Sequence, residues 1–400
     1  MKRFLKTLFV TLLIGAIVCF GFACDNGSNG NNTPKTPGLQ IRTFNGEKRI
    51  IGYVPEANEK DVDLVIPNDV VEIQSGAFDG NSTIKTIEVG ANVKKIAVGA
   101  FNGMKSLESI KLPYVGGSFN AVNEKKTFGY IFGADSFDEG DAITQNYNAS
   151  SSATYYLPKT LKTVEISANE NYKLPDYAFN GCRYLENVTL SGVVERGNNA
   201  FEGCRYIEKL EIPSSVTKIG NNAFVDMVGL LGTASTEETA SLKFANATTL
   251  TEIGEYAFKG TKLTKVVIPN GVTKIGAFAF SESSVEEVVL TSVVEICEYA
   301  FYKCEWLNSV RYNQGLTRIW SNAFNGCKRL EVFALANTTV TNQNEKGVIE
   351  LKGVDTNNLL VVGANAFANC GSKTYALTNE HVSYEYGVES AFVNTNYSVN

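Results

Sequence analysis

An Ala-Phe pair recurs along most of the chain at nearly constant intervals, and this recurrence constrains the fold more than any other feature of the sequence. Successive pairs mostly lie 21–23 residues apart, with longer intervals of 25, 34, 43 and 78 residues. A repeat of this length is one coil of a solenoid, because so short a unit buries its apolar side only against the neighbouring copy. The pairs that are in register end at Phe78, Phe101, Phe179, Phe201, Phe224, Phe258, Phe280, Phe301, Phe324, Phe367 and Phe392.

The unit from Cys204 to Phe224 shows how one coil is built. Ile207, Leu210 and Ile212 are separated by polar residues, which predicts a half-buried strand. A turn at 213–215 leads to a second extended segment at 216–220, and the Ala-Phe pair closes the coil. We expect each Phe to fill the interior of its coil. A Gly two residues after many of the Phe should permit a tight bend.

The order Leu-x-x-Ile-x-Ile-Pro, Val-x-x-Ile-Gly, Ala-Phe-x-Gly-Cys is matched best by Ile207–Phe224 and Leu263–Phe280. It resembles the BspA-type leucine-rich repeat, also called the Treponema pallidum type. The resemblance implies a mainly β fold, a curved leucine-rich-repeat solenoid with a parallel sheet and coils of 21–23 residues. It also implies display at a bacterial cell surface, and some members resemble adhesins that bind host matrix proteins or other microbes.

The ends of such an array need caps, because an open solenoid exposes its core and unpaired strand edges. We expect the repeats to occupy 62–375, between an N-terminal cap at 39–61 and a C-terminal cap at 376–400. The N-terminal cap contains a predicted strand at 48–53, and residues 384–396 are a candidate for a helix. The last Ala-Phe pair lacks the Val-x-x-Ile-Gly segment before it, so we expect it not to be a true repeat.

Three longer intervals between the pairs predict insertions, at 113–156, 230–241 and 336–357. The interval of 78 residues also hides at least one divergent coil. Loops that project from a solenoid often carry function. The alternative is that these loops have no function and are merely tolerated, because lengthening a surface loop costs little free energy.

Residues 1–23 have the plan of a secretory signal peptide. A basic start is followed by an uncharged apolar run from Thr7 to Phe22, and Ala23 precedes Cys24. The run is shorter than the ~20 residues that a membrane-spanning helix needs. A small residue directly before Cys resembles the bacterial lipobox, so we expect lipidation of Cys24, with simple secretion as the alternative. Residues 24–38 read as a flexible polar tether.

Composition argues against most catalytic classes. His381 is the only histidine, whereas Ser-His-Asp, Cys-His and multi-histidine metal sites each need a histidine beside its partners. The net charge of −6 argues against a nucleic-acid partner. We therefore expect no enzyme activity, no cofactor and no metal site. Four carboxylates that recur after the first strand residue should lie on a solvated face: Glu186, Glu208, Glu286 and Glu331.

Five cysteines share one position, three residues after the repeat Phe. Equivalent residues on adjacent coils stack about 4.8 Å apart, which is within reach of a disulfide. The same position holds Met, Thr or Ser in other coils, so we favour a ladder of buried free thiols, and we take Cys297 as a packing residue. The five are Cys182, Cys204, Cys304, Cys327 and Cys370.

Exposed aromatic and apolar residues at equivalent positions are the candidates for ligand binding. Tyr256, Phe278 and Tyr299 precede Ala-Phe in three consecutive coils and should form a stripe of rings, which either binds a partner or only shields the coil edge. A second candidate is the apolar pair on the outer side of the main sheet, Val267 and Val289. A third is the Cys-Arg-Tyr sequence of two neighbouring coils, Arg183, Tyr184, Arg205 and Tyr206.

These observations predict a non-catalytic binding or adhesion protein, secreted and anchored by lipid at the cell surface. Its partner would be an extracellular protein or glycan, and its only membrane contact would be the N-terminal lipid. The alternatives are a structural component of the cell envelope and a carbohydrate-binding accessory in nutrient capture. In the last case the aromatic stripe would stack on sugar rings.

Overall fold

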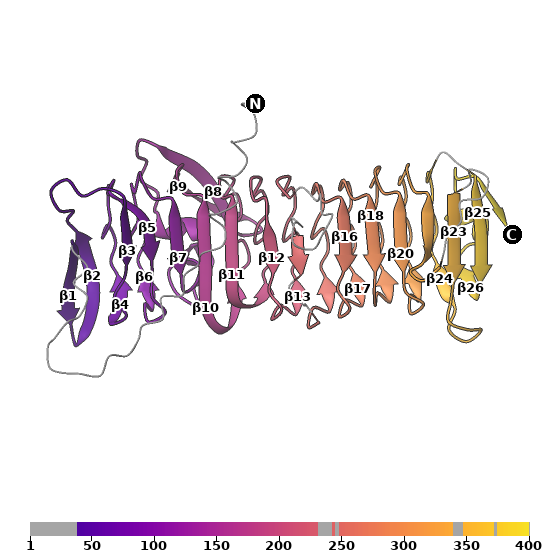
Figure 1. The fold of residues 1–400 in the computed structure, drawn as a ribbon, viewed down its shortest axis with the longest axis horizontal. Coiled ribbons are helices and arrows are strands. Elements are labelled where there is room, and N and C mark those ends of the chain that lie inside the picture. The colour runs from indigo at the N-terminus through magenta and orange to yellow at the C-terminus, as the bar shows by residue number, and fades with distance from the viewer. Residues whose placement is uncertain (1–37, 231–241, 245–247, 339–346, 372–373, 400) are drawn as a thin grey trace, which may run out of the picture. The chain divides into compact units, whose positions relative to one another are not determined.

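The structure is a computed structural model that describes residues 38–230, 242–244, 248–338, 347–371 and 374–399. The predicted signal peptide, the lipidation site Cys24 and most of the tether lie outside the described residues. Residues 36–400 form one unit by their contacts. Its strands follow one another in chain order, coil beside coil, as the colour gradient of Figure 1 shows.

Each repeat contributes a first strand from its Leu-x-x-Ile segment, and neighbouring first strands pair in parallel within three sheets, β3 to β11, β12 with β14, and β16 to β27. Val267, for example, lies opposite Val289, which lies opposite Arg311. The first strands are β3 (Val62–Val65), β5 (Ile84–Glu88), β7 (Ser109–Leu112), β10 (Thr163–Leu174), β11 (Asn187–Arg196), β12 (Leu210–Ile212), β14 (Leu242–Phe244), β16 (Lys265–Ile268), β18 (Glu287–Leu290), β20 (Ser309–Tyr312), β22 (Val332–Leu335), β23 (Gly347–Lys352), β25 (Tyr375–Glu380) and β27 (Tyr397–Val399).

The Val-x-x-Ile segments form a second ladder of short parallel strands. The long strands β10 and β11 continue from the first ladder into the second, with a register shift between Ser167 and Tyr172. The second strands are β4 (Val70–Ile73), β6 (Lys95–Ile96), β13 (Lys218–Ile219), β15 (Glu252–Ile253), β17 (Lys274–Ile275), β19 (Glu295–Ile296), β21 (Arg318–Ile319), β24 (Leu360–Val362) and β26 (Val382–Tyr384). The predicted parallel-sheet solenoid is thus confirmed.

The repeat Phe side chains fill the interior of the coils and stack along the array, as the sequence predicts. Phe280 is fully buried, and its ring centroid lies 5.1 Å from that of Phe258 and 5.2 Å from that of Phe301. In the interval of 78 residues, Phe128 and Phe132 continue the stack between Phe101 and Phe179. This is the divergent coil that the long interval hides.

An antiparallel hairpin lies at the N-terminal end of the described array. It consists of β1 (Leu39–Phe44) and β2 (Glu47–Tyr53), and β2 pairs in parallel with β4. Backbone groups of β2 are thereby satisfied on both sides, which is how such a hairpin covers the edge of a sheet.

The segment 113–156 contains more than a loop. Two short 3-10 helices, η1 (Asn123–Lys126) and η2 (Phe128–Ile131), are followed by the hairpin of β8 (Gly140–Asn148) and β9 (Ser151–Pro158). The fully buried side chain of Gln145 fixes the hairpin to the coils. Its Oε1 accepts from the Gly129 amide at 2.6 Å, and its Nε2 donates to the Asn180 carbonyl at 2.9 Å.

Two expectations about the C-terminal part are wrong. The predicted insertion 336–357 contains β23, a full strand between β22 and β25, in which Ile349 and Leu351 face the core. The last Ala-Phe pair belongs to a further coil, since Phe392 stacks on Phe367 at 5.3 Å and the amide of Phe367 donates to the Ala391 carbonyl. The helix α1 (Val388–Ala391) lies within that coil. The reason is that stacking requires the Phe and the backbone ladder, which this coil keeps, rather than the missing Ile-Gly segment.

Candidate binding surface

The residue before ten of the eleven Ala-Phe pairs has a left-handed backbone, which Gly and Asn tolerate and bulky residues avoid. The exception is Ser390, which lies in α1. In most coils this position holds Gly or Asn, and Tyr256, Phe278 and Tyr299 break that rule in three consecutive coils. All have φ between +54° and +66°, the others being Gly76, Gly99, Tyr177, Asn199, Asn222, Asn322 and Asn365. Tyr177, a fourth aromatic residue at this position, was not predicted from the sequence.

The stripe of Tyr256, Phe278 and Tyr299 is a tight parallel stack. The ring centroids lie 4.7 and 4.6 Å apart, at interplanar angles of 5° and 2°. Tyr302 contacts Tyr299 edge-on, and the Lys259 ammonium lies 5.8 Å from the Tyr256 ring centroid. The inner ring faces therefore cover one another, and a partner would meet ring edges and hydroxyl groups. The stripe does not offer the open faces that stacking on sugar rings requires.

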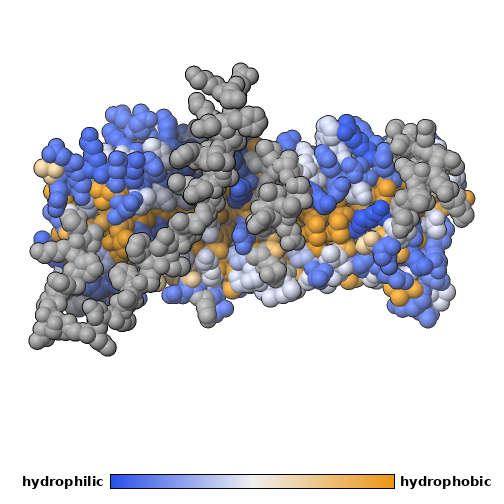
Figure 2. Space-filling view, viewed as in Figure 1, coloured by the Kyte–Doolittle hydropathy of each residue, from blue (hydrophilic) through white to orange (hydrophobic). Residues whose placement is uncertain are grey.

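The Val267 and Val289 pair lies on the outer side of β16 and β18. Val267 is 50% exposed, while an ion pair between Lys265 and Glu287, 3.0 Å long, lies beside it. Val289 lies opposite Arg311, and Arg311 lies opposite Ala334, which is buried. The face in Figure 2 shows hydrophobic residues along its middle and hydrophilic residues along its margins.

The second ladder carries an outer row of charges whose sign alternates from strand to strand. Lys218 Nζ lies 3.0 Å from Glu252 Oε2, and Lys173 Nζ lies 2.9 Å from Glu195 Oε1. Opposite charges on neighbouring strands stabilise a sheet and neutralise each other. The row comprises Lys173, Glu195, Lys218, Glu252, Lys274, Glu295 and Arg318. This face therefore presents no block of one charge to a partner.

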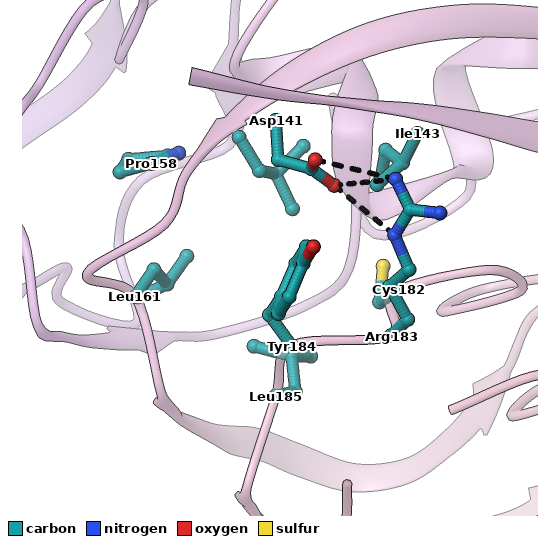
Figure 3. Close-up of a pocket in the computed structure, with 9 residues that line it drawn as sticks. Asp141, Ile143, Pro158, Leu161, Cys182, Arg183, Tyr184 and Leu185 are labelled. Atoms are coloured by element: carbon teal, nitrogen blue, oxygen red, sulfur yellow. Dashed lines mark hydrogen bonds and ion pairs between the residues drawn. The ribbon is translucent and has the colours of Figure 1, made fainter. Parts of the chain in front are cut away.

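Arg183 fixes the hairpin β8–β9 to the coils. Its guanidinium donates to both carboxylate oxygens of Asp141, at 3.0 to 3.2 Å (Figure 3). This pair lies beside a small, mainly apolar pocket that Tyr184 and side chains of the hairpin line. The ion pair and the hydrogen bonds raise the pKa of Arg183. Arg183 thus has a structural partner, which makes it less available to a ligand than the sequence suggests.

The other members of the Cys-Arg-Tyr pair are more open. Tyr206 is 57% exposed and its ring stacks on Tyr184 at 6.1 Å and 7°. Arg205 is exposed, and no carboxylate among the described residues pairs with it. The structure therefore stacks the rings of Tyr184 and Tyr206. Of the two arginines, only Arg183 has a carboxylate partner among the described residues.

Trp306 is a further exposed aromatic residue that was not predicted from the sequence. It occupies the position of Tyr184 and Tyr206, five residues after the repeat Phe, and is 48% exposed. The guanidinium of Arg329, at the same position of the next coil, lies 3.8 Å from the Trp306 ring centroid. The Cys-x-Trp sequence, parallel to Cys-Arg-Tyr, was the signal that could have identified it.

The thiol ladder has a specific hydrogen-bond pattern. Each of four Cys thiols donates to the carbonyl of the Phe one coil earlier, at 2.9–3.2 Å, and the Thr395 hydroxyl does the same at 2.7 Å. In these five coils the position therefore holds a small hydrogen-bond donor, whereas Met104 and Met227 fill it without donating. The six described cysteines are free and buried: Cys182, Cys204, Cys297, Cys304, Cys327 and Cys370.

Alkaline pH is expected to weaken the fold through these thiols. Burial raises the pKa of Cys304 to about 12, against ~8.5 for an exposed thiol. The contribution of the neutral thiol is complete below about pH 8.5 and is lost as the pH rises towards 12. The free energy of unfolding should therefore fall between pH 7 and pH 10 by less in Cys304→Ser than in the wild type, because Ser donates without ionising. Equal falls in both proteins would contradict this account.

The described part of the chain contains neither a metal site nor a membrane-spanning helix. No group of three or more His, Cys, Asp and Glu residues there is placed to hold a metal ion. His381 lies near Glu380, at 3.5 Å. Within the same residues, no helix has the length and apolar character needed to cross a membrane.

Parallel coils with a first strand, a second strand and a Phe-filled turn define a leucine-rich-repeat solenoid. Residues 57–127, 148–231 and 231–347 match the family model described as BspA type Leucine rich repeat region, in six copies. These ranges exceed half of the chain, and the chain belongs to this family. The family expected from the sequence is thus confirmed.

Three solved structures illustrate the likeness. A leucine-rich repeat protein from Bacteroides ovatus is 19% identical, with 91% of this chain and 98% of that chain covered and a TM-score of 0.44. A leucine rich cell surface protein from Faecalibacterium prausnitzii is 17% identical, with 93% and 96% covered and a TM-score of 0.32. The leucine-rich repeat protein of T. pallidum is 16% identical, with 84% and 88% covered and a TM-score of 0.18. No curated protein matches the chain.

Proposed function

We propose that this chain is a non-catalytic binding protein displayed outside a bacterial cell, where one side of its solenoid contacts a protein or glycan. The observation that carries the proposal is that departures from the repeat coincide in neighbouring coils. The coils of Phe258, Phe280 and Phe301 hold the aromatic stripe, and two of them hold the outward Val pair.

The backbone of the stripe supports this proposal. Tyr256, Phe278 and Tyr299 have φ of +56° to +58°, where an L residue other than Asn or Asp costs roughly 1–2 kcal/mol. Four equivalent coils avoid this cost with Asn. Strain of this kind persists where the surrounding structure enforces it, often at functional positions. Aromatic residues also dominate the centres of protein interfaces.

Display outside the cell is part of the proposal. The sequence of residues 1–24 supports secretion and a lipid on Cys24, and the polar segment that follows would hold the solenoid away from the membrane. The lipid would be the only membrane contact, and nucleic acid is not expected as a partner. One of the similar structures is described as a cell surface protein.

A capture experiment tests this function. The chain from residue 36 onward is immobilised and exposed in parallel to matrix proteins, mucins and envelope fractions of the source bacterium. Specific capture of a matrix protein or a mucin supports the proposal. Capture of self-envelope material alone would favour the structural role, and capture of nutrient polysaccharide alone would favour the accessory role.

A further inference from the structure

The hairpin of β8 and β9, which projects from the row of coils in Figure 1, has one covered edge and one open edge. The outer edge of β8 is attached to the coils. Its Asn146 amide donates to Asn180 Oδ1 at 3.0 Å, and its Ala142 carbonyl accepts from Arg183 Nη2 at 3.3 Å. The outer edge of β9 lies on the opposite side of the hairpin.

The pairing within the hairpin shows which main-chain groups of β9 point outward. Asn146 lies opposite Ser152. Thr144 lies opposite Thr154. Because the Asn146 amide points away from β9, both are non-hydrogen-bonded pairs, in which each strand turns its N–H and C=O groups outward. Tyr156 has the same orientation, and its amide donates to a carbonyl of the neighbouring coil at 3.1 Å.

Ser152 and Thr154 form the open part of this edge. Both residues are exposed, and among the described residues no group bonds to their main-chain N–H and C=O groups. Natural proteins guard such an edge with lysine, proline or a bulge. Here Pro158 lies at the far end of β9, and the register shift of the hairpin lies on β8. The unpaired groups of an extended strand are those that a further strand satisfies.

The hairpin is also free of charge, although the chain is acidic. Residues 142–158 contain no Asp, Glu, Lys or Arg, whereas the whole chain has a net charge of −6. Copies of one acidic chain repel each other through their charged surfaces. They approach at the least cost where a surface is uncharged. The outward side chains here are hydroxyl groups of Ser and Thr, which form favourable pairs across neighbouring strands.

The open edge is held in its extended shape before it meets a partner. The fully buried side chain of Gln145 bonds to the Gly129 amide and the Asn180 carbonyl. At the base of the hairpin, Arg183 bonds to Asp141. A strand that is already fixed loses little conformational freedom when it pairs, which favours association.

We propose that the open edge of β9 pairs with the same edge of a second copy of this chain, antiparallel and around a two-fold axis, so that two hairpins form one continuous sheet. With Ala153 at the axis, Ser152 lies opposite Thr154 of the second copy, and each such pair exchanges two N–H···O bonds. Each copy then satisfies the open edge of the other, whereas an extended peptide would bring a new open edge of its own. This inference does not rest on the proposed function.

Sedimentation equilibrium of the chain from residue 36 onward tests the pairing. The edge is short, so we expect weak association, with the mass rising from one copy towards two between about 10 µM and 1 mM. Sodium chloride at about 0.5 M should not weaken the dimer, because no ion pair forms across this edge. Hydrogen exchange at the amides of Ser152 and Thr154 should slow over the same range of protein concentration.

Lysine substitutions locate the interface. Ser152→Lys combined with Thr154→Lys should weaken the dimer about tenfold or more, because lysines on both copies of an edge strand repel each other and oppose pairing. Thr144→Lys is the matched control. Thr144 is also exposed and lies opposite Thr154, but it is on β8, whose outer edge the coils cover. This control should dimerise as the wild type does.

Four results would overturn the proposal: a wild type that remains a single copy at about 1 mM, an undiminished dimer in the double variant at an unchanged melting temperature, equal weakening in Thr144→Lys, or unchanged exchange at the Ser152 and Thr154 amides in the dimer. The exchange measurement needs no substitution, so it decides the matter if the double variant does not fold. Loss of ligand capture in the double variant, while the wild type stays a single copy, would assign the edge to an extended segment of another protein instead.

Discussion

Replacing Phe280 with Ala is expected to lower the free energy of unfolding by about 3–5 kcal/mol. Phe280 is fully buried between Phe258 and Phe301. The coil cannot collapse into the cavity, because the amide of Phe258 donates to the Ala279 carbonyl and that of Phe280 to the Ala300 carbonyl, both at 2.7 Å. Urea unfolding followed by circular dichroism measures the loss.

An exposed aromatic residue provides the control for this substitution. Tyr386→Ala removes a ring that is 76% exposed and should change the free energy of unfolding by less than about 0.5 kcal/mol. A loss below about 1 kcal/mol in Phe280→Ala would mean that the Phe stack does not hold the coils together as described.

Arg196→Ile is expected to stabilise the protein by about 1–4 kcal/mol. Arg196 occupies a core position that holds Ile219 on the next strand, and it is only 2% exposed. One guanidinium nitrogen donates to the Glu211 carbonyl at 2.9 Å, but Nε and Nη1 are buried with no partner among the described residues. Burial lowers the pKa of Arg196 to about 9, so the group is still charged at neutral pH. Ile would remove this buried charge and match the neighbouring coils.

Two variants separate this effect from a general gain in hydrophobicity. Arg205→Ile changes an exposed arginine and should not stabilise. Arg196→Ala removes the same charge but leaves a cavity, so its gain should be smaller than that of Arg196→Ile. The guanidinium also lies 5.7 Å from the Phe201 ring centroid and 5.3 Å from the Phe224 ring centroid. A loss of stability in Arg196→Ile, measured by thermal unfolding at neutral pH, would indicate that these cation–π contacts and the hydrogen bond to Glu211 outweigh the cost of burying the charge.

The repeat was predictable because each coil repeats the same physical requirements. The spacing of Ala-Phe pairs predicted the stacked Phe interior, and the alternation at Ile207, Leu210 and Ile212 predicted the parallel strands. The strand β23 was missed because it lies within the unusually long interval between Phe324 and Phe367. Its own alternation of Val348, Ile349, Glu350 and Leu351 was nevertheless a strand signal.

The candidate site was less predictable, because it depends on distances between coils. Sequence showed that Tyr256, Phe278 and Tyr299 share a position but not that their inner faces are closed at 4.6–4.7 Å. Arg183 and Arg205 looked equivalent until the distant Asp141 was found to pair with one of them. The coil before Trp306 lacks a residue at its position, because Val285 follows Phe280 one residue earlier than Leu307 follows Phe301, a difference that the sequence already contains.

The most direct test of the central claim uses a variant in which Tyr256, Phe278 and Tyr299 are all replaced by Asn, the residue that equivalent coils carry. Asn tolerates the left-handed backbone, so relief of strain should offset the lost ring contacts, each worth about 0.5–1.5 kcal/mol. We expect a melting temperature close to that of the wild type. In the capture experiment, the variant should lose at least about nine tenths of the specific binding to the matrix protein or mucin that the wild type captures. Undiminished capture by a folded variant would contradict the assignment of this side of the solenoid as the binding surface.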